Sequence, residues 1–277
     1  MLRVGGPLLL VAILASGCLL PPDPATDSGQ DVFNLYLVVL AMAAIVFIGV
    51  EGFILYAIFR YRRKPGDDVL PEQHHGNTAV EIVWTIIPTV IVFILFGFSL
   101  GTLGEVEARS EEPAVEIRVE GFQWNWRFDY GDGVVSGPQG NEPPVLAVPV
   151  GEPIRLRLES VDVNHSFYVP QFLIKRDLIP GQENSLEFTV TEAGTYSGQC
   201  AEFCGMAHAD MAFTVEAMER ADYDAWIAAL AAGEPPPGPD AGDCTTTVEL
   251  TTEALAFNTD TIEVPAGEDF CVELTNN

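Results

Sequence analysis

The sequence predicts an all-β Greek-key sandwich preceded by a two-helix transmembrane hairpin. Two long apolar runs near the N-terminus predict the hairpin, and short runs of alternating polar and apolar residues after residue 114 predict the sandwich. The 277 residues combine a positive mean hydropathy of +0.22 with a formal net charge of −27. Both properties coexist because apolar residues concentrate before Leu103, whereas acidic residues dominate from Glu105 onward.

This charge distribution makes nucleic acid an unsuitable partner, because phosphate binding needs a basic surface. The field of an acidic domain favours a basic protein partner instead. The five cysteines lie in three separate contexts, so a single disulfide framework describes them poorly. They are Cys18, Cys200, Cys204, Cys244 and Cys271.

Residues 1–18 have the order of a secretory signal, with Arg3, an apolar run and then small residues. Cys18 follows Ser-Gly, as at a bacterial lipoprotein cleavage site, where the cysteine becomes the lipidated N-terminus. An ordinary signal peptide or an uncleaved apolar tail is the alternative.

Residues 30–104 hold two apolar runs, about 32–59 and 80–103, each long enough to span a bilayer. The first run is followed by Arg60-Tyr61-Arg62-Arg63-Lys64, the strongest positive cluster of the protein. The positive-inside rule places the loop 60–78 in the cytoplasm and the acidic domain outside. We therefore expect a multi-pass protein of a bacterial plasma membrane with an extracytoplasmic C-terminal domain.

Glu51 lies inside the first run, where a carboxylate in lipid is costly. It is therefore expected to face a protein partner or to be protonated. A structural contact to a neighbouring helix is favoured over a role in a proton path.

Residues 105–232 form the predicted outer domain. Alternation at 115–119, 154–158 and 185–190, with Gly and Pro between, predicts antiparallel strands of a sandwich or barrel. A short helix is expected at about 221–232, and the Pro- and Gly-rich residues 233–243 predict a linker.

The segment 200–211 reads Cys-Ala-Glu-Phe-Cys-Gly-Met-Ala-His-Ala-Asp-Met and follows a strand-like stretch. Soft sulfur ligands with imidazole select copper or zinc over magnesium or calcium. A mononuclear blue-copper site needs one thiolate, whereas this loop offers two, and His165 adds a second imidazole. Such a set can hold two metal ions that share both thiolates. Sharing delocalises an electron and keeps the geometry nearly unchanged on reduction.

This loop, together with Asp162-Val163-Asn164-His165-Ser166-Phe167, resembles the CuA segments of cytochrome c oxidase subunit II. The resemblance covers roughly residues 30–232. It implies a cupredoxin-like fold and a binuclear copper centre that accepts electrons. These pass on, by way of His208, to haem in subunit I for O2 reduction coupled to proton translocation.

The resemblance also assigns the ligands. It implies that Cys200 and Cys204 bridge the two coppers, that His165 and His208 each bind one, and that Met211 is a weak ligand. Glu202 would bind through its backbone carbonyl. The Glu202 carboxylate would help to hold a Mg²⁺ ion shared with subunit I.

The aromatic run 121–130 contains Trp124. Alternating aromatics in a strand usually mean core packing. The resemblance implies instead that Trp124 receives electrons from cytochrome c. An exposed indole surrounded by acids such as Asp129 and Asp132 would suit a basic haem protein.

Residues 75–88 resemble the second-helix signature of the same family, in which the glutamate matching Glu81 marks the entrance of a proton channel in subunit I. The alternative is a solvated acid at a helix start, which the helix dipole favours. The stretch 175–181 also matches the family and is expected to be a turn near subunit I.

The tail 244–277 is strand-like and resembles the opening strands of a small cupredoxin, without a copper ligand set. We expect either a truncated electron-donor domain, which is favoured, or an addition pinned by a Cys244–Cys271 disulfide. About 34 residues rarely sustain a core of their own.

Several alternatives remain at this point. Cys200 and Cys204 could form a disulfide or join the two histidines in a zinc site. The chain could be a quinol oxidase subunit, the CuA domain of another terminal reductase such as nitrous oxide reductase, or a non-catalytic copper-binding membrane protein. The donor, cytochrome c or a small blue-copper protein, stays open.

Overall fold

The structure, a computed structural model, describes residues 20–63, 66, 72–73, 75–138, 140, 142–234, 236, 246–253, 256–257 and 270–276. The expected signal segment 1–18 with Cys18 therefore lies outside the described residues. So do Cys244 and most of the expected linker 233–243.

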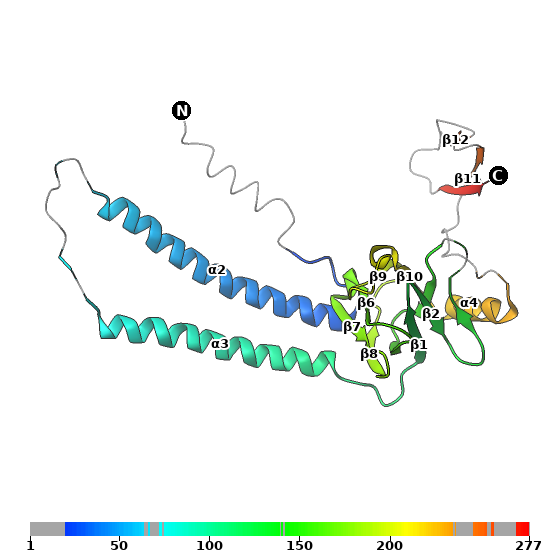
Figure 1. Cartoon of the computed structure of the whole chain (residues 1–277), viewed down its shortest axis with the longest axis horizontal. Coiled ribbons are helices and arrows are strands. Elements are labelled where there is room, and N and C mark those ends of the chain that lie inside the picture. Colours follow the sequence, from blue (N-terminus) through cyan, green and yellow to red (C-terminus); the bar gives the residue numbers. More distant parts are fainter. Residues whose placement is uncertain are drawn as a thin grey trace.

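Two long helices precede the β-domain (Figure 1). Helix α2 spans Asp27–Tyr61 and helix α3 spans Thr78–Val106, and both are long and apolar enough to cross a membrane. At 1.5 Å per residue they measure about 52 and 44 Å, more than the hydrocarbon core of about 30 Å. Both expected spans are present, and each helix extends beyond the expected apolar run by two to five residues at each end.

Polar side chains fix where both helices begin. The Thr26 hydroxyl accepts the Gly29 N–H at 3.0 Å at the start of α2. Asn77 caps α3 by accepting the Val80 N–H at 3.3 Å. Within α2, Glu51 is exposed, and no hydrogen bond or ion pair joins it to the described part of the chain.

The outer domain consists of two five-stranded sheets. The first has the order β3-β2-β1-β5-β8, with β1 Val115–Phe122, β2 Asn125–Asp129, β3 Val135–Ser136, β5 Pro153–Ser160 and β8 Asn184–Thr189. The second has the order β4-β10-β9-β6-β7, with β4 Val145–Pro149, β6 His165–Val169, β7 Ile174–Leu178, β9 Gly194–Cys200 and β10 Ala212–Met218. The expected cupredoxin-like sandwich behind a helical hairpin is confirmed.

Strand direction departs from expectation in two places. The prediction that all strands pair antiparallel is wrong, because β1 pairs with β5 in parallel and β4 pairs with β10 in parallel. Crossover connections join these pairs through the other sheet, which strand alternation alone does not reveal. The remaining named pairs in the sandwich are antiparallel.

The core fills the space between the sheets. In β5 the alternate residues Ile154, Leu156 and Leu158 are buried, as the alternation predicts. Strand β1 buries Ile117 and Val119 in the same way, but it also buries Glu120. Phe167 and Phe213 stack with their ring centroids 4.7 Å apart. Each such buried side chain stabilises the fold by about 1.5–3 kcal/mol.

Helix α4, Arg220–Ala232, covers the outside of β4 by burying Tyr223 and Trp226 against Ala147. It ends at Gly233, whose φ of 73° is accessible to glycine at little cost. The expected helix at 221–232 is therefore present.

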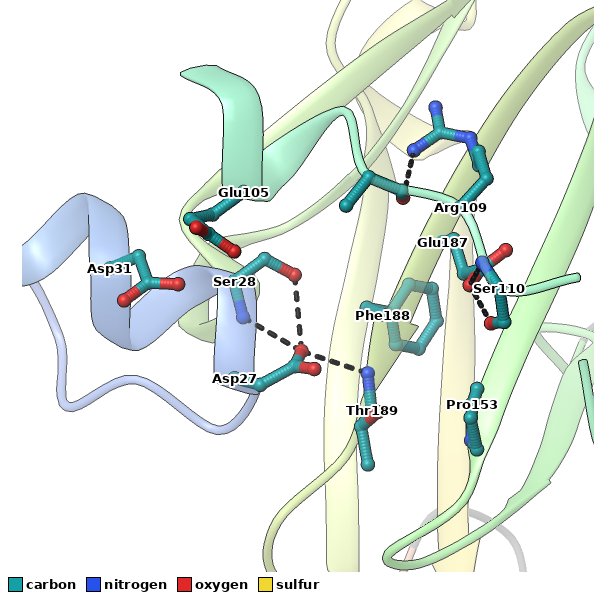
Figure 2. Close-up of a pocket in the computed structure, with 11 residues that line it drawn as sticks. Asp27, Ser28, Asp31, Glu105, Arg109, Ser110, Pro153, Glu187, Phe188 and Thr189 are labelled. Atoms are coloured by element: carbon teal, nitrogen blue, oxygen red, sulfur yellow. Dashed lines mark hydrogen bonds between the residues drawn. The ribbon is translucent and has the colours of Figure 1, made fainter. Parts of the chain in front are cut away.

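Strand β8 holds the ends of both helices that lie against the sandwich (Figure 2). The Asp27 carboxylate at the start of α2 accepts the Thr189 N–H at 2.9 Å. The Glu187 carboxylate accepts the Ser110 N–H, just after α3, at 2.7 Å, and it pairs with Arg155 at 2.9 Å. A cavity of about 320 Å³ lies at this junction.

In the tail, β11 Thr246–Glu253, β12 Ala256–Phe257 and β13 Phe270–Asn276 form a separate three-stranded sheet. The expected strand character is present there. The expected Cys244–Cys271 disulfide lies outside the described side chains.

Candidate metal centre

The ligand candidates meet at one end of the second sheet. His165 begins β6 and Cys200 ends β9, its neighbour in that sheet. Cys204 and His208 lie in the loop that follows β9, and Met211 precedes β10. Two backbone bonds close this loop onto the sheet, from Cys200 N–H to the Met211 carbonyl and from Ala201 N–H to the Ser166 carbonyl, each 3.0 Å.

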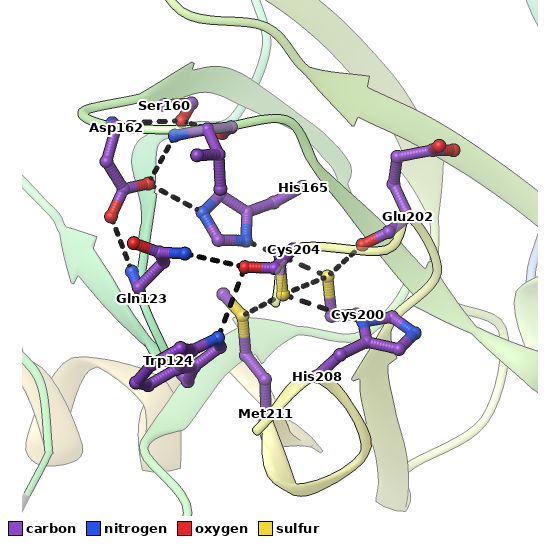
Figure 3. Close-up of polar contacts among 11 residues, drawn as sticks. Gln123, Trp124, Ser160, Asp162, His165, Cys200, Glu202, Cys204, His208 and Met211 are labelled. Atoms are coloured by element: carbon purple, nitrogen blue, oxygen red, sulfur yellow. Dashed lines mark hydrogen bonds and ion pairs between the residues drawn. The ribbon is translucent and has the colours of Figure 1, made fainter. Parts of the chain in front are cut away.

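The ligand atoms converge (Figure 3). The sulfurs of Cys200 and Cys204 lie 3.8 Å apart. His165 Nδ1 lies 3.8 Å from the Cys200 sulfur, and His208 Nδ1 lies 3.5 Å from the Cys204 sulfur. The Met211 sulfur lies 3.7 Å from that of Cys204. Each thiol therefore faces its own imidazole.

The distance between the two sulfurs shows whether Cys200 and Cys204 form a disulfide or could bind metal. A disulfide requires about 2.05 Å between sulfurs, so the two thiols are free. A metal–sulfur bond of about 2.3 Å exceeds half of their separation, so a bound ion would reach both sulfurs at once. Two thiols, two imidazoles and a thioether form a soft donor set that suits copper or zinc.

The electrostatics of the thiols favour bound cations. Burial opposes ionisation of Cys200, but hydrogen bonds with His165, with the backbone of Glu202 and Ser166, and with His208 together outweigh it and lower the Cys200 pKa to about 6. Burial and the charge on Cys200 raise the pKa of Cys204 to about 12. One thiolate therefore forms readily and the second resists ionisation unless positive charge compensates it.

Asp162 orients His165. Its carboxylate lies 2.8 Å from His165 Nε2, which leaves Nδ1 toward the Cys200 sulfur. The ring is fully buried, and a Cβ at Gly121 would lie 3.2 Å from it, so glycine in β1 makes room for the imidazole. A carboxylate on the far nitrogen is the usual partner of a metal-binding histidine.

Met211 and His208 complete the group from one loop. Met211 is 1% exposed, and its carbonyl accepts the indole N–H of the fully buried Trp126 at 3.3 Å. The His208 ring is half-buried and lies edge-on to Phe203, with centroids 5.8 Å apart. Phe203 is itself exposed, so this edge of the site opens to the surface.

Glu202 has two different surroundings. Its backbone carbonyl accepts the Cys200 thiol at 3.3 Å, which places that oxygen beside the sulfurs. Its carboxylate turns outward, 3.6 Å from Lys175 Nζ. The expectation of a turn at 175–181 is wrong for Lys175–Leu178, which belong to β7, because these residues pair with β6.

Trp124 touches the site. Its indole N–H donates to the Cys204 carbonyl at 3.2 Å, and the side chain is 38% exposed. The expectation that Asp129 and Asp132 surround this indole is wrong. The length of β2, about 16 Å, separates Trp124 from Asp129. Asp129 also pairs with Arg118 at 2.8 Å.

Gln123 and the carboxylate of Asp162 were missed as functional residues. Gln123 Nε2 donates to the Cys204 carbonyl at 2.7 Å. The spacing of Asp162, three residues before His165, was the available signal. For Gln123 the sequence carries no local signal, because its partner lies 81 residues away.

Glu81 lies apart from the metal centre, in the first turn of α3. Its carboxylate accepts the Asn77 N–H at 3.1 Å and so helps to cap the helix. This contact agrees with the alternative role of Glu81 as an acid at the start of a helix. Its role at the entrance of a proton channel stays a prediction.

Comparison with known proteins matches both halves of the chain. Residues 142–218 match a family model described as cytochrome c oxidase subunit II, periplasmic domain. Residues 16–102 match the model described as cytochrome c oxidase subunit II, transmembrane domain.

Two relatives show how far the similarity extends. Cytochrome c oxidase subunit 2 of Alkalihalophilus pseudofirmus is 35% identical over 237 residues, covering 82% of this chain and 68% of that protein. The subunit of Synechocystis sp. is 31% identical, covering 76% of each chain. Among solved structures, the periplasmic domain of subunit II of cytochrome oxidase of Bradyrhizobium japonicum is 28% identical, covering 45% of this chain and 99% of that one, with a TM-score of 0.41.

Proposed function

The chain belongs to the cytochrome c oxidase subunit II family, and from this premise we propose that it accepts electrons on a two-copper centre bound by its own side chains. Within the oxidase it acts as the subunit that receives electrons for the oxygen-reducing partner. The proposed ligands are His165, Cys200, Cys204, His208 and Met211, with the carbonyl oxygen of Glu202.

The observation that carries this proposal is the pairing of each thiol with its own imidazole. Cys200 faces His165 and Cys204 faces His208, while the two sulfurs lie 3.8 Å apart. A mononuclear blue-copper site uses two imidazoles but one thiolate, so it would leave the second buried thiol without a role. Two bound ions would use all four side chains.

Bound copper would supply one-electron redox chemistry, and the protein supplies the rigid surroundings. The ligands sit on β6, β9 and the tight loop before β10, which backbone hydrogen bonds close. Cys200, Cys204 and Met211 are at most 5% exposed, and His165 is fully buried. Such a preorganised site changes little when its charge changes, so electron transfer is fast.

The exposed side chains around the site suggest where electrons enter and leave it. Trp124 combines surface exposure with a hydrogen bond to Cys204, so it suits uptake from cytochrome c or a small blue-copper donor. Electrons would leave through His208, beside the exposed Phe203, to haem in subunit I. The Glu202 carboxylate turns outward beside Lys175, and it would help to hold a Mg²⁺ ion shared with that subunit.

The two candidate membrane spans and the bacterial relatives support a position in a bacterial membrane. Arg60, Arg62 and Arg63 at the end of α2 favour a cytoplasmic loop and an outer sandwich. Glu81 then lies near the cytoplasmic surface, where we propose that it marks the proton-channel entrance in subunit I.

Copper counting on the full chain in detergent tests the proposal. We expect two coppers per chain, near-infrared absorption, and a paramagnetic signal whose hyperfine pattern shows one electron shared by both nuclei. Cys204→Ser should leave one copper at most and abolish the shared signal. A single copper or zinc in the parent chain would contradict the proposal.

A further inference from the structure

The strongest unexplained contact lies at the tip of the β1–β2 hairpin. Phe122 pairs with Asn125, so Gln123 and Trp124 alone form the turn. A two-residue turn fixes both residues closely against the flanking strands. The tip reaches the metal-binding loop and meets it at the Cys204 carbonyl (Figure 3).

Two side chains share this one acceptor. Gln123 Nε2 lies 2.7 Å from the Cys204 oxygen, and Trp124 Nε1 lies 3.2 Å from it. A carbonyl oxygen carries two lone pairs and so accepts both donors. The Gln123 bond is the shorter of the two.

Gln123 is itself held in place. Its backbone N–H donates to Asp162 Oδ2 at 2.7 Å, and the other oxygen of that carboxylate lies 2.8 Å from His165 Nε2. A continuous series of hydrogen bonds therefore runs from His165 through Asp162 and Gln123 to Cys204. It joins both ligand-bearing segments to the hairpin tip.

Gly205 shows how tightly this contact is packed. A Cβ at this position would lie 3.0 Å from both Gln123 Nε2 and Trp124 Nε1. The residue also has a φ of +124°, which L side chains rarely adopt. The peptide after Cys204 thus fits against both donors only because glycine follows.

We propose that Gln123 is a positioning residue for electron uptake. Its carboxamide fixes the Cys204 carbonyl so that the Trp124 indole stays bonded to it. From that carbonyl, covalent bonds within Cys204 lead directly to a sulfur of the metal centre. The inference rests on the proposed copper function, because it assigns Gln123 to the uptake step of that function.

Hydrogen exchange of the Trp124 indole N–H in the copper-free full chain tests whether Gln123 keeps the indole bonded to the Cys204 carbonyl. This test needs no redox chemistry. The chain has four tryptophans, so hydrogen exchange of each indole N–H is resolvable by NMR after selective labelling, and Trp124→Phe assigns the signal. Gln123→Met keeps the side-chain length but removes the donor. We expect about 10-fold faster exchange at Trp124, as loss of one hydrogen bond predicts.

Gln182→Met is the matched control. Gln182 is exposed in the same domain, and among the described residues its side chain bonds only to Asn184. The Gln182→Met variant should leave the hydrogen-exchange rate of the Trp124 indole unchanged. Parent-like exchange in Gln123→Met would overturn the proposal.

The copper-loaded chain gives the second readout. With a reduced cytochrome c as donor, Gln123→Met and Gln123→Glu should slow copper reduction about 10-fold or more, while copper content and the near-infrared band stay at parent values. Loss of copper in both variants would assign Gln123 to metal retention and overturn the uptake role. If the parent itself binds no copper pair, the proposed function fails. Indole exchange still shows whether Gln123 holds Trp124 against the Cys204 carbonyl.

Discussion

His165 shows how one neighbouring carboxylate decides what an imidazole can do. Asp162 receives three N–H groups, from the His165 ring, from Gln123 and from Val163, at 2.8, 2.7 and 2.6 Å. An ionised carboxylate accepts all three donors with its two oxygens and has no proton of its own that needs an acceptor. The histidine is thereby held with Nδ1 toward the sulfurs.

Replacing this acceptor should weaken metal binding. Asp162→Asn keeps the shape, but its amide N–H₂ must face one of the three donors. We expect copper affinity to fall about 10- to 100-fold, the usual cost of losing the partner of a metal-binding histidine. Competition with a copper chelator measures it, and Asp222→Asn, an exposed residue on α4, controls for lost charge. Equal affinity in both variants would refute the role of Asp162.

At this scale the sequence predicted the proposed ligands better than the residues that support them. The positions from Cys200 to Met211 are local, so residue type and spacing suffice to single them out as candidates. Gln123 meets Cys204 only because a hairpin tip folds onto a loop 81 residues later. The predicted ring of acids around Trp124 failed for the same reason, since strand geometry carries Asp129 away.

At the scale of elements, strand β8 connects the membrane hairpin to the sandwich. Alternation predicted this strand, but not its neighbours in the sheet, because pairing depends on contacts distant in sequence. Two residues in its C-terminal half hold the two helices, with Thr189 bound to Asp27 and Glu187 bound to Ser110. Hydrogen bonds to this one strand therefore attach both α2 and the segment after α3 to the sandwich (Figure 2).

The Glu187 contact should make this junction sensitive to acid. Burial alone would raise the Glu187 pKa, but Ser110 and Arg155 outweigh it and lower the pKa below the ordinary value of 4.5. The stabilisation is therefore complete above pH 4.5 and is lost as the pH falls through the lower folded-state pKa. Glu187→Gln should cost about 2 kcal/mol of unfolding free energy at pH 7, the usual worth of hydrogen bonds to a charged group.

Denaturant unfolding of the full chain in detergent, followed by tryptophan fluorescence, measures this difference at each pH. Below the folded-state pKa the parent and Glu187→Gln should converge. Glu183→Gln is the control, since Glu183 pairs with Arg157 at the exposed surface and such pairs contribute little. A deficit in Glu187→Gln that is independent of pH would argue against this account.

At the scale of the whole molecule, charge asymmetry predicts orientation. The positive cluster follows α2, while acidic residues dominate beyond Glu105. An epitope inserted after Asp132, in the loop before β3, should bind antibody on intact spheroplasts. The same epitope inserted after Glu72 should require permeabilised cells. The reverse pattern would invert the proposed topology.

The same asymmetry predicts how a donor approaches. Asp129 is paired with Arg118 and lies a strand length from Trp124, so steering must come from the summed field of a chain with net charge −27. Reduction of the copper-loaded chain by a basic cytochrome c should therefore slow about 10-fold between low and physiological salt. A small neutral reductant should show no such dependence. If the cytochrome c rate were also independent of salt, docking would depend on exposed apolar side chains of the loop after β9, where Phe203 is 78% and Met206 97% exposed, and a less charged donor would fit better.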